Sequence, residues 1–164
     1  MLCLIGLGTI GKMLVPMARG FGMSVTAFRR DISKDGDIDG VEKIYPTEDR
    51  YVALRQADYI ILVLPLNEET FHIIDEKAFS SMKSNAFLIN MSRGDHIDRV
   101  ALEKALADKS IAGFDTDVFG KSQPTLMILC SETNVFSLHL IQVVSHMQQF
   151  PEERERFTRI FRGL

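Results

Sequence analysis

The sequence predicts an α/β fold, a doubly wound parallel sheet with helices on both faces. Three observations lead to this expectation. Short, continuous apolar runs recur up to residue 119, as is typical of strands that are buried on both faces. Segments with helical spacing of apolar residues separate these runs, and such alternation of strand and helix is the pattern of a parallel sheet. A glycine-rich turn, GLGTIG, joins the first apolar run to the first helical segment.

The expected strands follow one another along the chain, each bounded by polar or glycine-containing turns. They are expected at residues 2–5, 25–28, 41–45, 59–64, 86–89, 111–114 and 134–138. The segment 31–40 is polar and contains glycine, which predicts a loop beyond the second strand.

Four helices are expected between these strands. The first follows the glycine turn, and Pro16 inside it should bend it because proline removes a backbone hydrogen bond. The second begins with Thr47 as its N-cap, the third spans 75–82, and the fourth, Arg99–Asp108, is capped by Asp98. Side chains expected to face inward are Ile10, Met13, Leu14, Met17 and Phe21 in the first helix, Val52, Ala53, Leu54 and Ala57 in the second, and Val100, Leu102, Ala105 and Leu106 in the fourth.

Length and composition indicate one soluble globular domain. The chain has 164 residues, of which 46% are hydrophobic and 25% charged, and its net charge is −3. Without a basic cluster, a nucleic-acid partner is not expected. Cys3 and Cys130 are isolated, which predicts neither a metal site nor a disulfide and fits a reducing, cytoplasmic setting. Glycines and Lys12 interrupt the apolar N-terminus, so we expect no signal peptide and no membrane helix.

The glycine turn predicts a dinucleotide site, because each glycine has a separate physical reason there. Gly6 permits the tight turn, Gly8 lets the backbone approach a pyrophosphate, and Gly11 allows close packing of helix on strand. The free N–H groups at the start of the helix would face the phosphates. The arrangement is that of a Rossmann fold.

The end of the second strand bears on which nicotinamide cofactor is bound. Arg29 and Arg30 stand where an NAD site usually places a carboxylate, and their planar guanidinium groups suit the additional 2′-phosphate of NADP. NADP is therefore the expected cofactor. In the alternative, both arginines are solvated loop residues and Asp31 binds the ribose of NAD.

Further along, the chain contains in order the segments ILVLPLNEETFHIID, FLINMSRGDHID, ALEKALADKSIAGFDTDVF and NVFSLH. Together with LIGLGTIG, this series resembles the cofactor-binding domain of the D-isomer-specific 2-hydroxyacid dehydrogenases over residues 2–139. The resemblance implies hydride transfer between a nicotinamide and a small 2-keto or 2-hydroxy acid, as in glyoxylate and hydroxypyruvate reductases. It also implies a homodimer.

The resemblance also assigns roles to individual residues. Arg93 would bind the substrate carboxylate and polarise its carbonyl, and His139 would exchange the hydroxyl proton. Asp117 would lie near the nicotinamide amide. The remaining cofactor-lining positions would be Thr9, Ile10, Leu64, Pro65, Thr70, Met91 and Ser92. The other histidines, His72, His96 and His146, have no counterpart in the motifs and are interpreted as surface residues.

Three departures from the family pattern bear on activity. Ser122 or Gln123 stands where the family has a glutamate that pairs with the histidine, and without it the protonated histidine loses a stabilising partner. Formate dehydrogenases of the same superfamily carry glutamine in this region, so formate is a minor alternative substrate. Leu140–Gln142 replaces a glycine-containing segment, and the chain begins within the first strand, which implies that the substrate domain is missing.

These observations lead to two hypotheses of different classes. The first is an incomplete or weakly active dehydrogenase, with a Rossmann domain at 1–139 and a charged, amphipathic helical tail within 140–164. The second is a non-catalytic, dinucleotide-responsive dimerisation module, similar to the corepressor of this family. The 3-hydroxyisobutyrate dehydrogenases also begin with GLGxxG, but they lack the later motifs and need a helical second domain.

Overall fold

The computed structural model describes residues 1–30 and 38–116, which form a parallel six-stranded sheet in the order β3-β2-β1-β4-β5-β6. This is the strand order of the doubly wound dinucleotide-binding folds. The strands are β1 (Leu2–Ile5), β2 (Val25–Phe28), β3 (Lys43–Tyr45), β4 (Tyr59–Leu62), β5 (Phe87–Asn90) and β6 (Gly113–Thr116).

Helices connect these strands. They are α1 (Thr9–Gly20), α2 (Arg50–Leu54), α3 (Glu76–Ser81) and α4 (Arg99–Ala107), and short 3₁₀ turns occur at η1 (Thr47–Asp49) and η2 (Gly94–His96). The side chains of Asp75 and Asp98 accept hydrogen bonds from the first turns of α3 and α4, at 2.7 Å from Ala78 N and 3.1 Å from Ala101 N. The predicted cap of α4 is thus confirmed.

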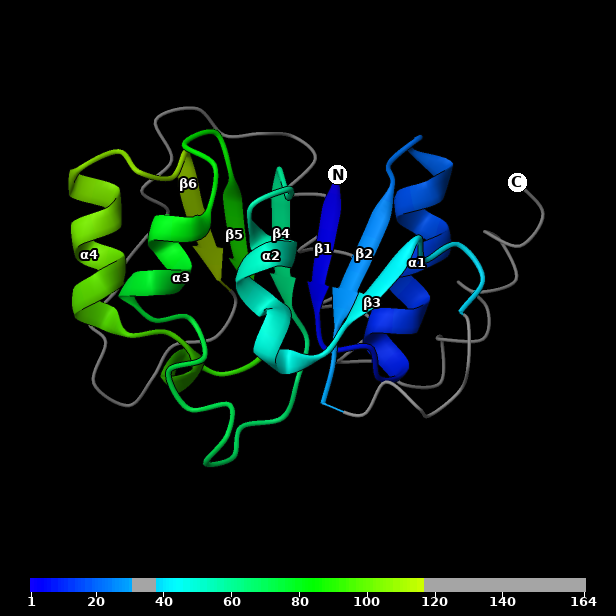
Figure 1. Ribbon diagram of the computed structural model, residues 1–164, viewed down its shortest axis with the longest axis horizontal. Coiled ribbons are helices and arrows are strands. Elements are labelled where there is room, and N and C mark those ends of the chain that lie inside the picture. The colour runs from blue at the N-terminus through cyan, green and yellow to red at the C-terminus, as the bar shows by residue number, and fades with distance from the viewer. Residues whose placement is uncertain (31–37, 117–164) are drawn as a thin grey trace.

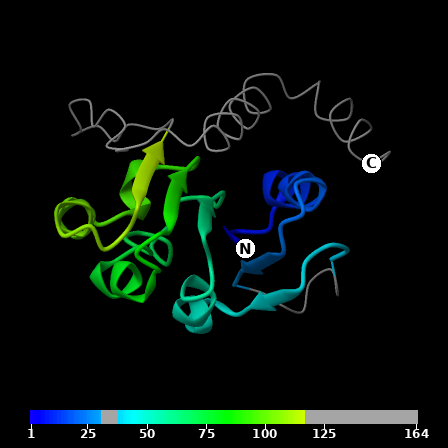
Figure 2. The ribbon, with the colours of Figure 1, turned by 90° about the horizontal axis from the view of Figure 1, so that it is seen from above.

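The sheet lies between two layers of helix, with α1 on one face and α2, α3 and α4 on the other (Figures 1 and 2). Strand β1 shows why its sequence is apolar throughout. Leu2 and Leu4 belong to the core beneath α1, whereas Cys3 and Ile5 belong to the core beneath the other three helices. All four side chains are fully buried, so the predicted parallel sheet covered on both faces is confirmed.

Helix α1 continues through Pro16 without interruption, so the predicted local bend stays a prediction. The expected boundaries of these six strands agree with the structure within two residues. Differences of two residues occur in β3, which begins at Lys43 rather than residue 41, in β4, which ends at Leu62 rather than residue 64, and in β6, which spans Gly113–Thr116 rather than 111–114.

Three side chains expected to face inward are exposed instead. Phe21 is 64% exposed because α1 ends at Gly20, so the helical spacing no longer applies to it. Val52 is 43% exposed because α2 has only five residues and packs through Ala53 and Leu54. Val100 is 75% exposed, since the buried face of α4 is formed by Ala101, Leu102 and Ala105.

The expected helix cap at Thr47 is also wrong. Pro46 occupies the N-cap of η1, with extended backbone, and no side chain caps the turn. The α-helix itself begins only at Arg50, because the chain first passes through the 3₁₀ turn. Thr47 is thereby placed beside the groove described below.

The polar loop 31–37, the strand expected at 134–138 and the tail of 140–164 lie outside the described residues. The same holds for Asp117, His139 and His146.

Candidate dinucleotide site

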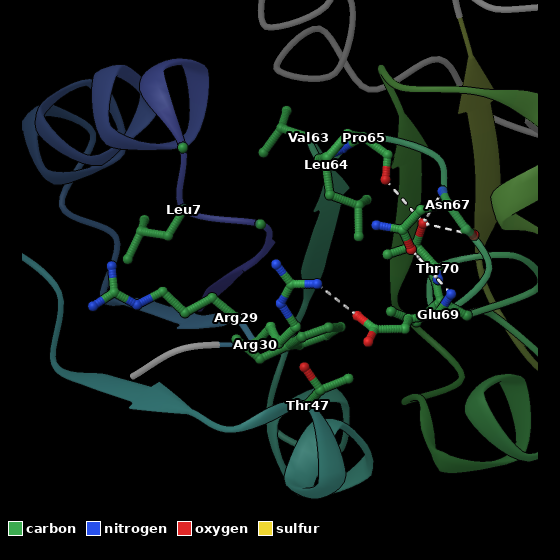
Figure 3. Close-up of a pocket in the computed structure, with 14 residues that line it drawn as sticks. Leu7, Arg29, Arg30, Thr47, Val63, Leu64, Pro65, Asn67, Glu69 and Thr70 are labelled. Atoms are coloured by element: carbon green, nitrogen blue, oxygen red, sulfur yellow. Dashed lines mark hydrogen bonds and ion pairs between the residues drawn. The ribbon is translucent and has the colours of Figure 1, made fainter. Parts of the chain in front are cut away.

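A groove of about 380 Å³ lies at the carboxyl ends of β1, β2 and β4 (Figure 3). In parallel sheets of this order, ligands bind outside the carboxyl ends of the strands, where the strand order reverses. The described side chains and backbone that line it come from Gly6, Leu7, Gly8, Phe28, Arg29, Arg30, Thr47, Val63, Leu64, Pro65, Asn67, Glu69, Thr70 and Ile73.

The glycine turn forms one end of the groove. Gly6 has a φ of +102°, and a Cβ there would lie 2.7 Å from the Val63 carbonyl oxygen, so only glycine fits. A Cβ at Gly11 would lie 2.6 Å from the Gly6 carbonyl oxygen, which accounts for the close approach of α1 to β1. A Cβ at Gly8 would meet nothing within 4 Å and would stand in the open groove. The space at Gly8 is what a pyrophosphate needs to approach the backbone.

The first turn of α1 is suited to bind phosphate. Gly8 is the N-cap, no side chain caps the helix, and the first turn contains no acidic residue. The free N–H groups and the positive end of the helix dipole therefore remain available to an anion. Thr9, Ile10 and Gly11 form this turn, next to the groove rather than in its lining. The structure thus fits the pyrophosphate of a dinucleotide.

The two arginines after β2 extend in opposite directions (Figure 3). Arg30 reaches across the groove, and its Nη1 lies 3.0 Å from the Glu69 carboxylate on the loop after β4. Arg29 extends to the side of Leu7. Arg30 and Glu69 are 75% and 64% exposed, so the ion pair lies at the solvent-facing rim. Arg30 is therefore the arginine closer to the centre of the groove.

The loop after β4 forms the opposite wall and is shaped by Asn67 and Thr70. The Asn67 carboxamide oxygen accepts hydrogen bonds from the backbone of Glu69 and Thr70, each at 3.0 Å. The Thr70 hydroxyl accepts from Asn67 N and donates to the Pro65 carbonyl, each at 2.8 Å. The Thr70 hydroxyl is thus bonded within the loop, and the hydrogen bonds that shape the loop come from its own residues.

The loop after β5 carries Arg93 next to this wall. The buried Ser92 hydroxyl accepts a hydrogen bond from Leu64 N at 2.9 Å, which ties the two loops together. Asn90, also buried, accepts from Ser92 N at 3.0 Å and donates to the Arg93 carbonyl at 2.8 Å. Met91 is buried beneath the loop, whereas Arg93 is exposed. The cation is thus presented at the same edge of the sheet as the groove.

His96, interpreted from the sequence as a surface residue, is fully buried. The interpretation was wrong because it rested on the lack of a motif, and polarity alone does not place a histidine at the surface. Burial lowers the pKa of His96, and the backbone carbonyls of Pro65 and Arg93 oppose part of this shift. His72 is exposed, as expected.

The structure thus brings most of the predicted cofactor residues to one place. Those that line the groove are Gly6, Gly8, Arg29, Arg30, Leu64, Pro65 and Thr70. Met91, Ser92 and Arg93 lie on the adjoining β5 loop, outside the groove lining. Sequence reasoning did not select Asn67 or Glu69, although Asn67 precedes Thr70 by three residues in a spacing typical of a side-chain-stabilised turn.

Within residues 1–30 and 38–116, no group of histidine, cysteine or acidic side chains could hold a metal ion. No helix in the same part of the chain is long and apolar enough to span a membrane.

Comparison with known proteins agrees with this geometry. The family described as D-isomer specific 2-hydroxyacid dehydrogenase, NAD binding domain, matches residues 1–147. Glyoxylate reductase of Thermococcus litoralis is 41% identical over 117 residues, which is 71% of this chain and 34% of that protein. Glyoxylate reductase of Pyrococcus horikoshii is 39% identical over 116 residues, with the same two shares. The chain therefore spans about a third of the length of the curated relatives that it matches.

Among solved structures, the D-isomer specific 2-hydroxyacid dehydrogenase of Lactobacillus delbrueckii in its NAD-complexed form has a TM-score of 0.66. It is 31% identical, and the match covers 77% of this chain and 39% of that one. The fold, the glycine groove and these similarities agree, and the chain belongs to the D-isomer-specific 2-hydroxyacid dehydrogenases, of which it carries the NAD-binding domain.

Proposed function

We propose that this chain is the cofactor-binding part of an NADP-dependent oxidoreductase that acts on a small 2-keto or 2-hydroxy acid, and that it is weakly active by itself. The observation that carries the proposal is the groove, in which the open position at Gly8, the uncapped start of α1 and the cation Arg30 lie at one sheet edge. Each suits a different part of a dinucleotide phosphate. NADP is preferred over NAD because of Arg30.

In this proposal the residues around the groove bind and orient, and the bound nicotinamide supplies the hydride. The backbone N–H groups of the first α1 turn hold the pyrophosphate, and the apolar side chains Leu7, Val63 and Leu64 exclude water from the groove wall. Arg30 holds the 2′-phosphate as a planar, permanently charged donor.

Arg93 is proposed to bind the acid. Its guanidinium is exposed at the carboxyl end of β5, and its Nη1 donates to the Ser92 carbonyl at 2.7 Å, which leaves further donors for a carboxylate. A fixed cation also stabilises the negative charge that develops on a carbonyl oxygen during reduction. The roles of His139 and Asp117 are carried over from the family resemblance and stay predictions.

The proposal is tested by titrating the chain with NADPH and NADH while nicotinamide fluorescence is recorded. We expect NADPH to bind more tightly than NADH, and Arg30→Gln to remove that difference. Lys43→Gln is the matched control, because Lys43 is exposed and lies over the Tyr45 ring rather than in the groove. Absence of NADPH binding would contradict the proposal, and tighter binding of NADH would contradict its choice of cofactor.

Glyoxylate-dependent oxidation of NADPH tests the reaction. We expect the chain alone to be slow and a complementing substrate domain to raise the rate. A dimer that forms only with cofactor, and that stays inactive with such a domain, would instead favour the dinucleotide-responsive dimerisation module.

A further inference from the structure

The buried imidazole of His96 has no part in the function proposed above. His96 is the last residue of η2, whose N-cap is Arg93, and it has no solvent exposure. The backbone around it is anchored on both sides: Ile74 N donates to the His96 carbonyl at 3.0 Å and His72 N donates to the Asp95 carbonyl at 3.0 Å. In such a position, each ring nitrogen that lacks a protein partner costs free energy.

The hydrogen bonds around Nδ1 bear on the position of the imidazole proton. Nδ1 lies 3.2 Å from Arg93 N and 3.0 Å from the Arg93 carbonyl oxygen. That oxygen already accepts from the Asn90 side chain at 2.8 Å and from His96 N at 3.2 Å. The Arg93 N–H, in contrast, points at Nδ1. If Nδ1 accepts from the Arg93 N–H, the proton of the neutral ring is on Nε2.

The loop after β4 lies next to the His96 ring, because the backbone carbonyl of Pro65 on that loop acts on the ring. Nε2 is shielded from solvent and makes no hydrogen bond of ordinary geometry to the part of the chain that the structure describes. The backbone carbonyl of Pro65 raises the pKa of the ring, against the larger lowering by burial. The Pro65 carbonyl is held in place by the Thr70 hydroxyl at 2.8 Å. The ring thus stands between the loop after β4 and the loop after β5.

We propose that His96 is a positioning residue for Arg93. As a neutral imidazole with its proton on Nε2, it accepts a hydrogen bond from the Arg93 backbone N–H at Nδ1. This hydrogen bond fixes the backbone that places the Arg93 guanidinium beside the loop after β4. The inference rests on the proposed role of Arg93. It explains why a polar ring is buried where an apolar side chain would cost less. The charged groups that act on the ring are Arg93 and Asp95, with opposite effects.

The test compares substitutions that keep or remove the acceptor at the position of Nδ1. His96→Asn keeps one, His96→Gln moves it one carbon further out, and His96→Leu removes it. Long-range ¹H–¹⁵N NMR spectra of the unsubstituted chain should show the Nε2–H tautomer. Hydrogen exchange of the Arg93 amide should be similar in His96→Asn and about tenfold faster in His96→Gln and His96→Leu, as loss of one buried hydrogen bond predicts.

His72→Asn is the matched control, because His72 is exposed and asparagine tolerates its positive φ of 49°. It should leave the exchange of the Arg93 amide unchanged. An Nδ1–H tautomer in the unsubstituted chain, or slow exchange in His96→Gln, would overturn the proposal even if His96→Leu does not fold. A chain that fails to bind NADPH but shows the expected tautomer and exchange would instead contradict the proposed function and the catalytic part of this inference.

Discussion

The glycine groove and the β5 loop lie at the same edge of the sheet but are built in different ways. The shape of the groove is set by the backbone, because Gly6 and Gly11 have no room for a side chain and Gly8 leaves open space. The shape of the β5 loop is set by buried polar side chains, since Asn90, Ser92 and His96 all form hydrogen bonds to the backbone. The groove therefore depends on the absence of side chains at its glycines, whereas the β5 loop depends on the hydrogen bonds of its buried polar side chains.

This difference indicates how each region should fail. A side chain added to the groove acts through steric overlap, which nothing nearby can relieve when the neighbouring atom belongs to the backbone. A side chain removed from the β5 loop instead leaves a buried donor without an acceptor. Substitutions in the two regions should therefore differ in size and in what they change.

The largest effect is expected for Gly6→Ala. The substitution combines an unfavourable φ of +102° with a Cβ placed 2.7 Å from the Val63 carbonyl oxygen, so it should lower the free energy of unfolding by about 2–5 kcal/mol. Gly8→Ala is the matched control and should lower it by less than about 1 kcal/mol, although its Cβ enters the groove. Urea denaturation measures both.

Gly8→Ala should nevertheless weaken NADPH binding, because its methyl group would occupy the space proposed for the pyrophosphate. If both alanine variants were equally stable and bound NADPH equally well, the glycine backbone would not determine the shape of the groove.

A smaller effect is expected for Ser92→Ala, which removes the link between the two regions. The Leu64 N–H would lose its acceptor at 2.9 Å while remaining partly buried, so stability should fall by about 1–3 kcal/mol. Ser80→Ala is the control: its hydroxyl is exposed and bonds only within α3, so a change below about 0.5 kcal/mol is expected. Equal losses in thermal or urea denaturation would show that the link is unimportant.

The groove could largely be predicted from the sequence, and the β5 loop could not. Glycine between an apolar strand and an amphipathic helix has a local meaning, because the turn, the helix start and the strand are adjacent in the chain. The roles of Gly6 and Gly11 follow from this local context and agree with the geometry. Contacts such as Ser92 to Leu64 join residues far apart in the sequence, and no spacing rule predicts them.

His96 and Glu69 show the same limit. Neither stands in a periodic pattern: His96 is buried because η2 packs against the chain around Ile74, and Glu69 faces Arg30 because the loop after β4 folds back on itself. Both outcomes depend on tertiary packing. The exposed Phe21 reflects a related error, in which helical spacing was extended one residue beyond the end of α1 at Gly20.

Buried His96 predicts a dependence of stability on pH. Burial lowers the pKa of His96 below its ordinary value of 6.5, so the unfolded chain binds a proton at a higher pH than the folded chain does. The contribution of neutral His96 to the free energy of unfolding should therefore be complete above about pH 6.5. It should decrease as the pH falls from there towards the lowered pKa of the folded chain. Urea denaturation between pH 5 and 8 measures this slope. His96→Asn should flatten it relative to the unsubstituted chain, and His72→Asn should not; equal slopes in all three would contradict the prediction.

The smallest effect on stability, and the sharpest on specificity, is expected for Glu69→Gln. The carboxylate of Glu69 lies at the rim 3.0 Å from Arg30, and an exposed pair of this kind contributes well below 1 kcal/mol, so the unfolding free energy should change by less than about 0.5 kcal/mol. Glu69 nevertheless forms an ion pair with Arg30, the residue that is proposed to bind the 2′-phosphate, so the carboxylate and the phosphate compete for the same guanidinium. Its neutralisation should tighten NADPH binding about two- to fivefold and leave NADH nearly unchanged, since only NADPH carries the competing phosphate. Glu68→Gln is the control, because Glu68 is exposed one residue earlier and does not line the groove. An equal increase in NADPH affinity in both variants would indicate a general effect of charge. An equal increase in NADH affinity in Glu69→Gln would mean that Arg30 does not bind the 2′-phosphate.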